Sequence, residues 1–138
     1  MIFDAKRIVD ARSYAKRRCK ATIQKSGKLG FTANAAELMR LEQGARLLVS
    51  ECNSSDLAVV VLKGMQDERG FKVRKSMAYF TVDMKAFFDQ RGIDYRNAEH
   101  SVAYDIVMLD ETFEGQPVFK LTRRLIKRRG KQEEDRPL

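Results

Sequence analysis

The chain has 138 residues, of which 43% are hydrophobic, and a formal net charge of +8. This length and apolar content fit a single folded domain and exclude a disordered chain. The longest apolar run, residues 57–62, is too short for a membrane span, and the N-terminus lacks the apolar core of a secretory signal. We therefore expect a cytoplasmic protein with no membrane partner, in which Cys19 and Cys52 are reduced thiols rather than a disulfide.

Positive charge is concentrated towards the two ends of the sequence. Residues 1–28 carry a net charge of +7, residues 120–138 carry +5, and the segment 29–119 between them carries −4. Basic segments of this kind commonly bind polyanions by releasing counterions from a phosphate backbone. The alternative is that the basic ends only keep the chain soluble.

The first half of the chain predicts two strands, a short helix and a hairpin. Polar and apolar residues alternate in the first strand, the four residues 53–56 are turn formers, and Thr32 or Asn34 can cap the helix. Gly44 is expected to end the helix. The expected elements lie over residues 20–25, 29–32, 35–41, 45–52 and 57–63.

The second half predicts the same order of elements after a polar linker at 64–70. Asp83 is a good helix N-cap, and Met84, Phe87 and Phe88 follow at the spacing of one apolar helix face. Gly92 is expected to close this helix. The expected strands lie over residues 71–75, 77–81, 102–109 and 117–123.

The repeated order predicts an α+β fold, mainly β, made of two duplicated ββαββ units. A four-stranded unit with one small helix exposes an apolar sheet face and open strand edges. A second unit can cover that face and close a small barrel or sandwich. We expect one globular domain over residues 20–123, made of repeats 20–63 and 71–123 and flanked by basic terminal arms at 1–19 and 124–138. The alternative is a plain α+β meander whose halves look alike by chance.

The first half also carries a short family-like pattern. A Gly-Lys turn leads into an apolar strand, a short helix ending in Leu, a glycine and a final hairpin, and the matching positions are Gly27, Lys28, Leu29, Phe31, Ala36, Leu38, Leu41, Gly44, Leu47, Val49 and Val59 to Val61. This pattern resembles the AbrB/MazE/MraZ-type swapped-hairpin DNA-binding superfamily, well over residues 20–63 and poorly over 71–123. The chain departs from it at Phe31-Thr32, where the family commonly has Ile/Val-Pro, and at Ser76, where the second half lacks the Gly-Arg/Lys turn.

The resemblance implies an interleaved β-barrel built from two such units, here in tandem within one chain. It also implies DNA contacts from basic residues near the first strands of each unit. By position, these residues are Lys20, Lys25, Lys28, Lys72, Arg74 and Lys75.

The arms supply further candidates for phosphate contacts, because the planar guanidinium of arginine donates two hydrogen bonds at once. The N-terminal arm can be a helix over residues 4–20 or an extended segment laid on a partner. The candidates in the arms are Arg12, Lys16, Arg17, Arg18, Arg123, Arg124, Lys127, Arg128 and Arg129.

Residue patterns for catalysis are missing from the sequence. The single histidine, His100, lies beside Glu99 in a segment that reads as a polar loop, and no phosphate-binding glycine motif or metal-ligand spacing occurs. We therefore expect no enzyme activity, no cofactor, no metal and no small-molecule substrate. Four aromatic residues have the spacing of core residues rather than of a stacking platform: Tyr79, Phe80, Phe87 and Phe88.

Two functions remain open from the sequence. The first is a nucleic-acid-binding protein resembling a transcriptional regulator, with DNA expected as partner rather than RNA. The second is a non-catalytic structural or accessory component of a large assembly, such as a phage particle, whose arms bind neighbouring subunits.

Overall fold

The structure is a computed structural model that describes residues 2–11, 19–63 and 67–128. Its elements follow the predicted order: η1 (Ala5–Arg7), β1 (Lys20–Ile23), β2 (Lys28–Phe31), α2 (Ala33–Met39), β3 (Arg46–Glu51), β4 (Leu57–Leu62), β5 (Phe71–Ser76), β6 (Tyr79–Asp83), α3 (Lys85–Gln90), β7 (His100–Phe113) and β8 (Gln116–Lys127). The prediction of a mainly β fold is confirmed.

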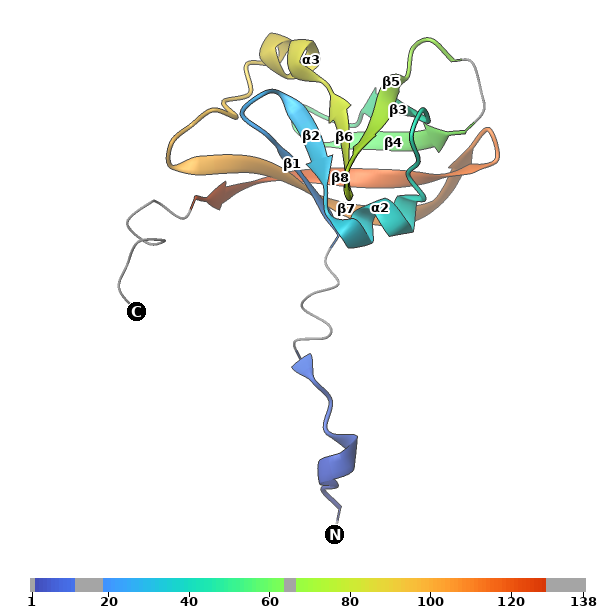
Figure 1. Cartoon of the computed structure of the whole chain (residues 1–138), viewed down its shortest axis with the longest axis vertical. Coiled ribbons are helices and arrows are strands. Elements are labelled where there is room, and N and C mark those ends of the chain that lie inside the picture. Colours follow the sequence, from blue (N-terminus) through green and yellow to red (C-terminus); the bar gives the residue numbers. More distant parts are fainter. Residues whose placement is uncertain (1, 12–18, 64–66, 129–138) are drawn as a thin grey trace.

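The eight strands form one closed antiparallel barrel (Figure 1). Around the barrel the strands follow the order β1-β2-β6-β5-β3-β4-β8-β7, and β7 closes onto β1. Closure pairs the backbone groups that an open sheet would leave at its edges. Exchanging β1–β4 with β5–β8 in this order reproduces the same set of neighbouring strands.

The barrel interior is filled by the apolar positions of each alternating strand. One inward row crosses four strands through Ile23, Leu29, Val82 and Val73, which are at most 1% exposed. The outward neighbours on the same strands are polar, basic or small. This period of two is what residues 20–31 and 71–83 predict.

The two helices cover the ends of the barrel rather than its side (Figure 1). Helix α2 buries Ala35, Ala36 and Met39, while α3 buries Phe88, whose ring lies 6.5 Å from that of Tyr104. Helix α2 ends earlier than predicted. Arg40, not Gly44, takes the left-handed cap conformation, because the backbone N–H of Leu41 already bonds back to Ala36.

The last hairpin is longer than predicted. β7 and β8 run for 14 and 12 residues and meet in a tight turn at Glu114-Gly115. The polar sequence around residues 110–116 suggests a loop, but the ladder resumes beyond an irregularity between Met108 and Thr112. β8 also continues through Lys127, so residues 124–127 belong to a barrel strand rather than to the C-terminal arm.

The N-terminal arm does not form the continuous helix that was one of the alternatives, within its described part. Residues 5–7 form a single 3-10 turn that begins at Asp4, and the next residue, Ile8, is extended. Farther along, Cys19 is half-buried and Cys52 is exposed, and no disulfide joins them. In the described part of the chain, no helix is long and apolar enough to cross a membrane.

Candidate nucleic-acid interface

The strand order brings together the two hairpins that carry the predicted DNA-binding residues. β1 and β2 form the first hairpin, β5 and β6 form the other, and the two are joined through the β2–β6 ladder. We call the outer surface of these four strands and their turns the hairpin face. It contains five of the six residues implied by the resemblance: Lys20, Lys25, Lys28, Lys72 and Arg74. The sixth, Lys75, lies opposite Phe80 on the inward phase of β5, and its ammonium group lies 5.6 Å from the centre of that ring.

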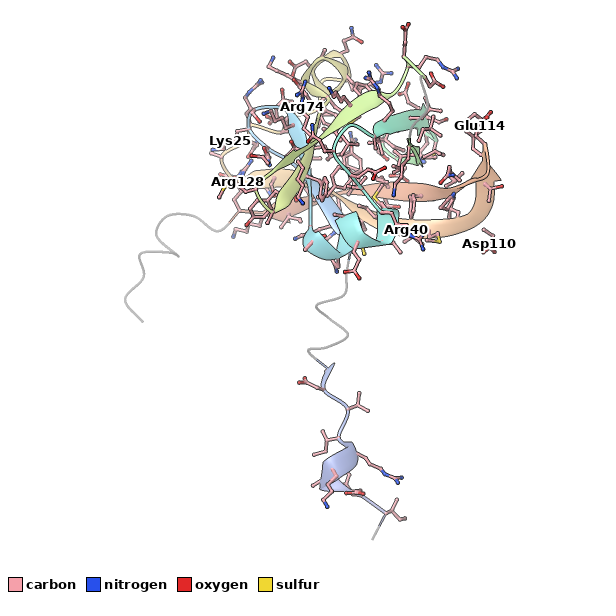
Figure 2. All side chains as sticks on the ribbon, turned by 45° about the vertical axis from the view of Figure 1, so that its right-hand side comes forward. Lys25, Arg40, Arg74, Asp110, Glu114 and Arg128 are labelled. Atoms are coloured by element: carbon pink, nitrogen blue, oxygen red, sulfur yellow. The ribbon has the colours of Figure 1, made fainter. Side chains whose placement is uncertain are left out.

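The hairpin face is strongly basic. Residues 20–31 and 71–83 contain six Lys or Arg and one acidic residue, Asp83. The opposite charge gathers elsewhere, since residues 105–114 of the long hairpin contain four acidic residues and no Lys or Arg. Figure 2 shows Lys25 and Arg74 on one side of the barrel and Asp110 and Glu114 on the other. The barrel is therefore not the uniform, mildly acidic body that the charge of residues 29–119 suggests.

The register places a row of mostly small residues across the middle of the hairpin face. Thr22 lies opposite Gly30, and Gly30 lies opposite Thr81. The row continues to Arg74 on one side and, through Ala103 of β7, to Arg124 on the other. Because adjacent strands are about 4.8 Å apart, the two arginines are separated by about 24 Å measured along the curved surface. The small residues of this row are not bare, because the side chain of Gln24 lies over Gly30 and Ala103 is fully buried.

A second outward row adds charge along one margin of the face. Lys28 of β2 lies opposite Asp83 of β6, and Lys72 of β5 lies opposite Arg46 of β3. Arg46 is a further cation at this margin that the sequence alone does not indicate, since its position beside β5 depends on the pairing of distant strands. Its guanidinium donates a hydrogen bond to the carbonyl oxygen of Gly70 and is half-buried.

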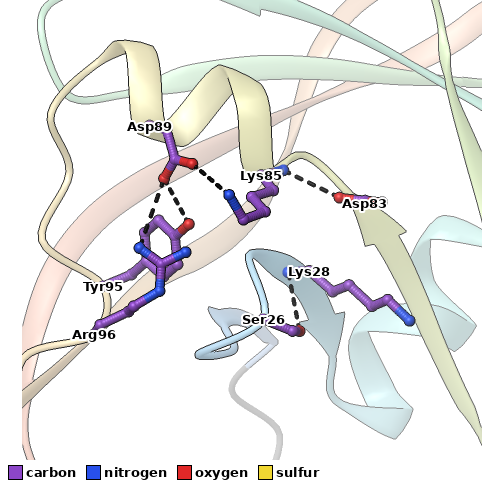
Figure 3. A network of polar contacts seen from close by, with 7 residues as sticks. All are labelled: Ser26, Lys28, Asp83, Lys85, Asp89, Tyr95 and Arg96. Atoms are coloured by element: carbon purple, nitrogen blue, oxygen red, sulfur yellow. Dashed lines mark hydrogen bonds and ion pairs between the residues drawn. The ribbon is translucent and has the colours of Figure 1, made fainter.

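Lys28 extends its side chain into solvent. Figure 3 shows it directed away from the polar group around Asp89. In that group, Asp89 accepts a 2.6 Å hydrogen bond from the hydroxyl of Tyr95 and forms a 2.9 Å ion pair with Lys85. The Tyr95 hydrogen bond and then Lys85 hold the pKa of Asp89 below its ordinary value. The carboxylate of Asp89 is thus satisfied by Lys85 of the same helix, α3, and by Tyr95 of the following loop, and it does not neutralise Lys28.

Other predicted contact residues have different surroundings. Arg124 lies at the end of the row that runs from Arg74 through Gly30 and Ala103, and it is paired with Asp105 at 2.7 Å. Arg123 lies on the other side of β8, beside His100 in a pocket of about 310 Å³, and Lys127 is exposed at the end of β8. The remaining arm candidates lie outside the described residues: Arg12, Lys16, Arg17, Arg18 and Arg129.

Arg128 is engaged in hydrogen bonds within the fold, and its assignment as a nucleic-acid contact stays a prediction. Its Nε donates hydrogen bonds to the carbonyl oxygens of Asn97 (2.7 Å) and His100 (3.1 Å), and its Nη2 donates one to that of Tyr95 (3.1 Å). The side chain ties the loop after α3 to the end of β8. The sequence shows only a basic run here, with no sign of the carbonyl groups that the fold brings to it.

The aromatic residues predicted to be core are not all buried. Phe88 is fully buried, and Phe80 and Phe87 pack partly against the core. Tyr79 is 68% exposed, so its assignment to the core is wrong. The alternation of β6 contains the signal, because Tyr79 shares a phase with the polar residues Thr81 and Asp83, whereas Phe80 shares one with Val82.

Several features bear on catalysis and cofactors. His100 begins β7 rather than lying in a loop, and its pocket also contains Arg91, which is paired with Glu51. Over residues 2–11, 19–63 and 67–128, no group of three or more His, Cys, Asp or Glu side chains is arranged to hold a metal ion. The absence of enzyme activity stays a prediction from the sequence.

Comparison with known proteins adds no assignment. No family model matches the chain, and neither the curated proteins nor the solved structures contain a match.

Proposed function

We propose that this protein binds nucleic acid, DNA in preference to RNA, through the hairpin face and without catalysis. The observation that carries the proposal is the gathering of five Lys and Arg residues, from both halves of the sequence, onto the outer surface of four adjacent strands and their turns, with one acidic residue, Asp83, among them. Clustered cations on one surface attract a phosphate backbone and release its counterions.

We also propose that the two halves are duplicated ββαββ units in a swapped-hairpin arrangement of the AbrB/MazE/MraZ type. The barrel order supports this, because it is unchanged when the strands of one half are exchanged for those of the other. In both halves the first hairpin pairs with the second hairpin of the other half, through β1–β7 and β3–β5. A transcriptional regulator that acts in the cytoplasm fits this arrangement.

The salt dependence of DNA binding tests the proposal. The affinity of a 20-base-pair duplex should fall steeply between 50 and 200 mM salt, and Lys28→Ala, Lys72→Ala and Arg74→Ala should each lower the slope of log K against log salt by about one. Lys120→Ala is the matched control. It lies on β8, diametrically opposite β6 in the barrel, and points outward between Ala58 and Val107.

The control decides how the result is interpreted. If Lys120→Ala changes the slope as much as Arg74→Ala does, binding is not localised to the hairpin face. A wild-type protein with a flat salt response, or with no affinity for DNA or RNA, would remove the proposal altogether.

A role in a large assembly is the second candidate, and the ends of the barrel favour it. The chain enters the barrel beside Ile106 of β7, whose backbone N–H donates a hydrogen bond to the carbonyl oxygen of Cys19. It leaves the barrel at Lys127, which lies opposite His100 of β7. These two points are six residues, or about 20 Å, apart along β7. Large apolar side chains near the N-terminus are also exposed: Ile2, Phe3, Ile8 and Val9. The two basic ends therefore join the barrel at separate points, the N-terminal one at Lys20 of the hairpin face and the C-terminal one at the end of β8.

Sedimentation of the full chain and of a chain lacking residues 1–11 distinguishes the two candidates. The assembly role predicts oligomers that depend on these residues and no requirement for nucleic acid. The DNA-binding role predicts that removal of residues 1–11 leaves the salt-dependent affinity of the hairpin face intact.

A further inference from the structure

The turn between β5 and β6 presents two large apolar side chains to solvent. Met77 is 90% exposed and Tyr79 is 68% exposed. Ser76 lies opposite Tyr79 in the ladder, so Met77 and Ala78 are the two residues of a tight hairpin turn. Single exposed apolar residues are ordinary on protein surfaces. Here two of them lie together at one hairpin tip, within a basic face.

The ring of Tyr79 belongs to the hairpin face. Tyr79 and Thr81 are two residues apart on β6 and point outward, and Thr81 lies opposite Arg74. Tyr79 and Arg74 are therefore diagonal neighbours, a relation that places the two residues about 7–8 Å apart, with their Cβ atoms somewhat closer. A ring and a guanidinium at this spacing can contact a base and a phosphate of one strand.

The neighbouring aromatic ring is already engaged. The ammonium group of Lys75 lies 5.6 Å from the ring centre of Phe80, which is partly buried against the core. Tyr79 thus differs from Phe80 in having its ring on the solvent side. A stacking platform needs an exposed aromatic ring beside cations, and this turn supplies both.

The backbone conformation of the turn also supports a functional role for its exposed side chains. Met77 has φ of 57°, in the left-handed region where glycine is preferred at the first position of a two-residue hairpin turn. The chain keeps a long side chain there although that side chain is almost entirely exposed. The corresponding turn of the first hairpin has Gly27 in the left-handed region and packs against α3. Strained residues that gain no packing occur at functional positions.

We propose that Tyr79 stacks on an unpaired base of single-stranded nucleic acid, while Arg74 and the neighbouring cations hold the phosphates on either side of that base. Met77 lies beside the stacked base and shields it from water. The inference rests on the proposed nucleic-acid-binding function and narrows it, since a base inside a duplex has no free face to offer this ring.

Binding of a 20-nucleotide thymidine homopolymer and of a 20-base-pair duplex tests the inference. Tyr79→Ala should weaken binding of the single strand by about 5- to 100-fold, and Tyr79→Phe, which keeps the ring, should bind within about twofold of wild type. Duplex affinity should change by less than about threefold in both variants. Thermal unfolding of each variant establishes that the barrel is intact.

A spectroscopic signal reports the stacking directly. The chain has no tryptophan and four tyrosines, so tyrosine emission can be followed without interference. The single strand should quench the wild-type emission, and the quenched component should be missing in Tyr79→Phe.

The outcomes separate the inference from the function on which it rests. If wild-type protein binds neither the single strand nor the duplex, the proposed function fails, and the inference fails with it. If wild type binds the single strand and Tyr79→Ala binds it equally well, the function stands and the inference is wrong. An equal loss on single strand and duplex also overturns it, because stacking on an unpaired base predicts a loss on the single strand alone.

Discussion

Gly27 lies so close to Lys85 that no side chain fits between them. A Cβ atom on Gly27 would come within 2.5 Å of the Cβ of Lys85 and 2.9 Å of its Cα, and Gly27 has φ of 91°. The turn of the first hairpin is therefore in direct contact with the start of α3. This contact joins the first hairpin to the helix of the other half.

Gly27→Ala is expected to destabilise the protein by about 2–4 kcal/mol. The left-handed backbone costs about 1–2 kcal/mol for a residue with a Cβ, and the clash with the backbone of Lys85 adds strain of similar size. Urea unfolding monitored by circular dichroism measures the change. Gly115→Ala is the control, since φ there is 77° but nothing lies within 4 Å of the added atom. Equal effects at both glycines would show that the contact with Lys85 adds nothing.

Arg128→Ala should lower stability by about 1.5–3 kcal/mol, because three buried or half-buried carbonyl groups lose a charged donor. Arg128→Lys should restore little of this, since a single ammonium group cannot reproduce the geometry of the guanidinium. Chemical denaturation and duplex binding should be measured on the same preparations. A variant that keeps full stability but loses DNA affinity would show that Arg128 contacts nucleic acid and does not hold the loop.

Met77→Gly should stabilise the protein by about 0.5–1 kcal/mol. Glycine adopts positive φ without the steric cost borne by Met77, and a side chain that is 90% exposed gives up almost no packing when it is removed. The midpoint of urea unfolding measures this gain. Met77→Ala serves as the comparison, because it removes the side chain and keeps the strain, and it should leave stability almost unchanged. Destabilisation by glycine would mean that the methionine packs against the barrel.

Lowering the pH should destabilise the contact between α3 and the loop that follows it, because it protonates Asp89. The folded-state pKa of Asp89 is lower than its unfolded value, so its contribution to stability is complete above the unfolded pKa of about 4 and is lost as the pH falls through the folded pKa. Asp89→Asn should therefore be less stable than wild type at pH 7, and the difference should shrink towards pH 2. The measurement is urea unfolding of both proteins across this range. A difference that does not vary with pH would show that protonation of Asp89 is not involved.

Much of the fold could be predicted because the strands are short and alternate cleanly. The expected strand at 71–75 and the observed β5 differ by one residue, and the four-residue turn at 53–56 joins β3 to β4 as its composition indicates. The order of strands around the barrel depends on long-range packing, which local alternation does not encode. For this reason Arg46 appears beside Lys72 only in the folded chain.

Residue type and position near the first strands predict Lys28, Lys72 and Arg74 as candidate contacts, and the fold places all three on the hairpin face. Their contact with nucleic acid stays a prediction. Arg128 looks the same in sequence, but its partners are backbone carbonyl groups of the loop 95–100, and composition gives no indication of them. The exposure of Tyr79 follows from strand phase, which outweighs the general tendency of aromatic residues to be buried.

The exchange symmetry of the barrel has a consequence for where the chain can be cut. Strands of one half contact strands of the other at β1–β7, β2–β6, β3–β5 and β4–β8, so neither half has a complete set of neighbours within itself. Cleavage in the connection between β4 and β5 would leave two fragments that hold each other by four ladders and remain associated as a nicked complex. The same connectivity would let a circularly permuted chain, beginning at β5 and ending after β4, build an equivalent barrel.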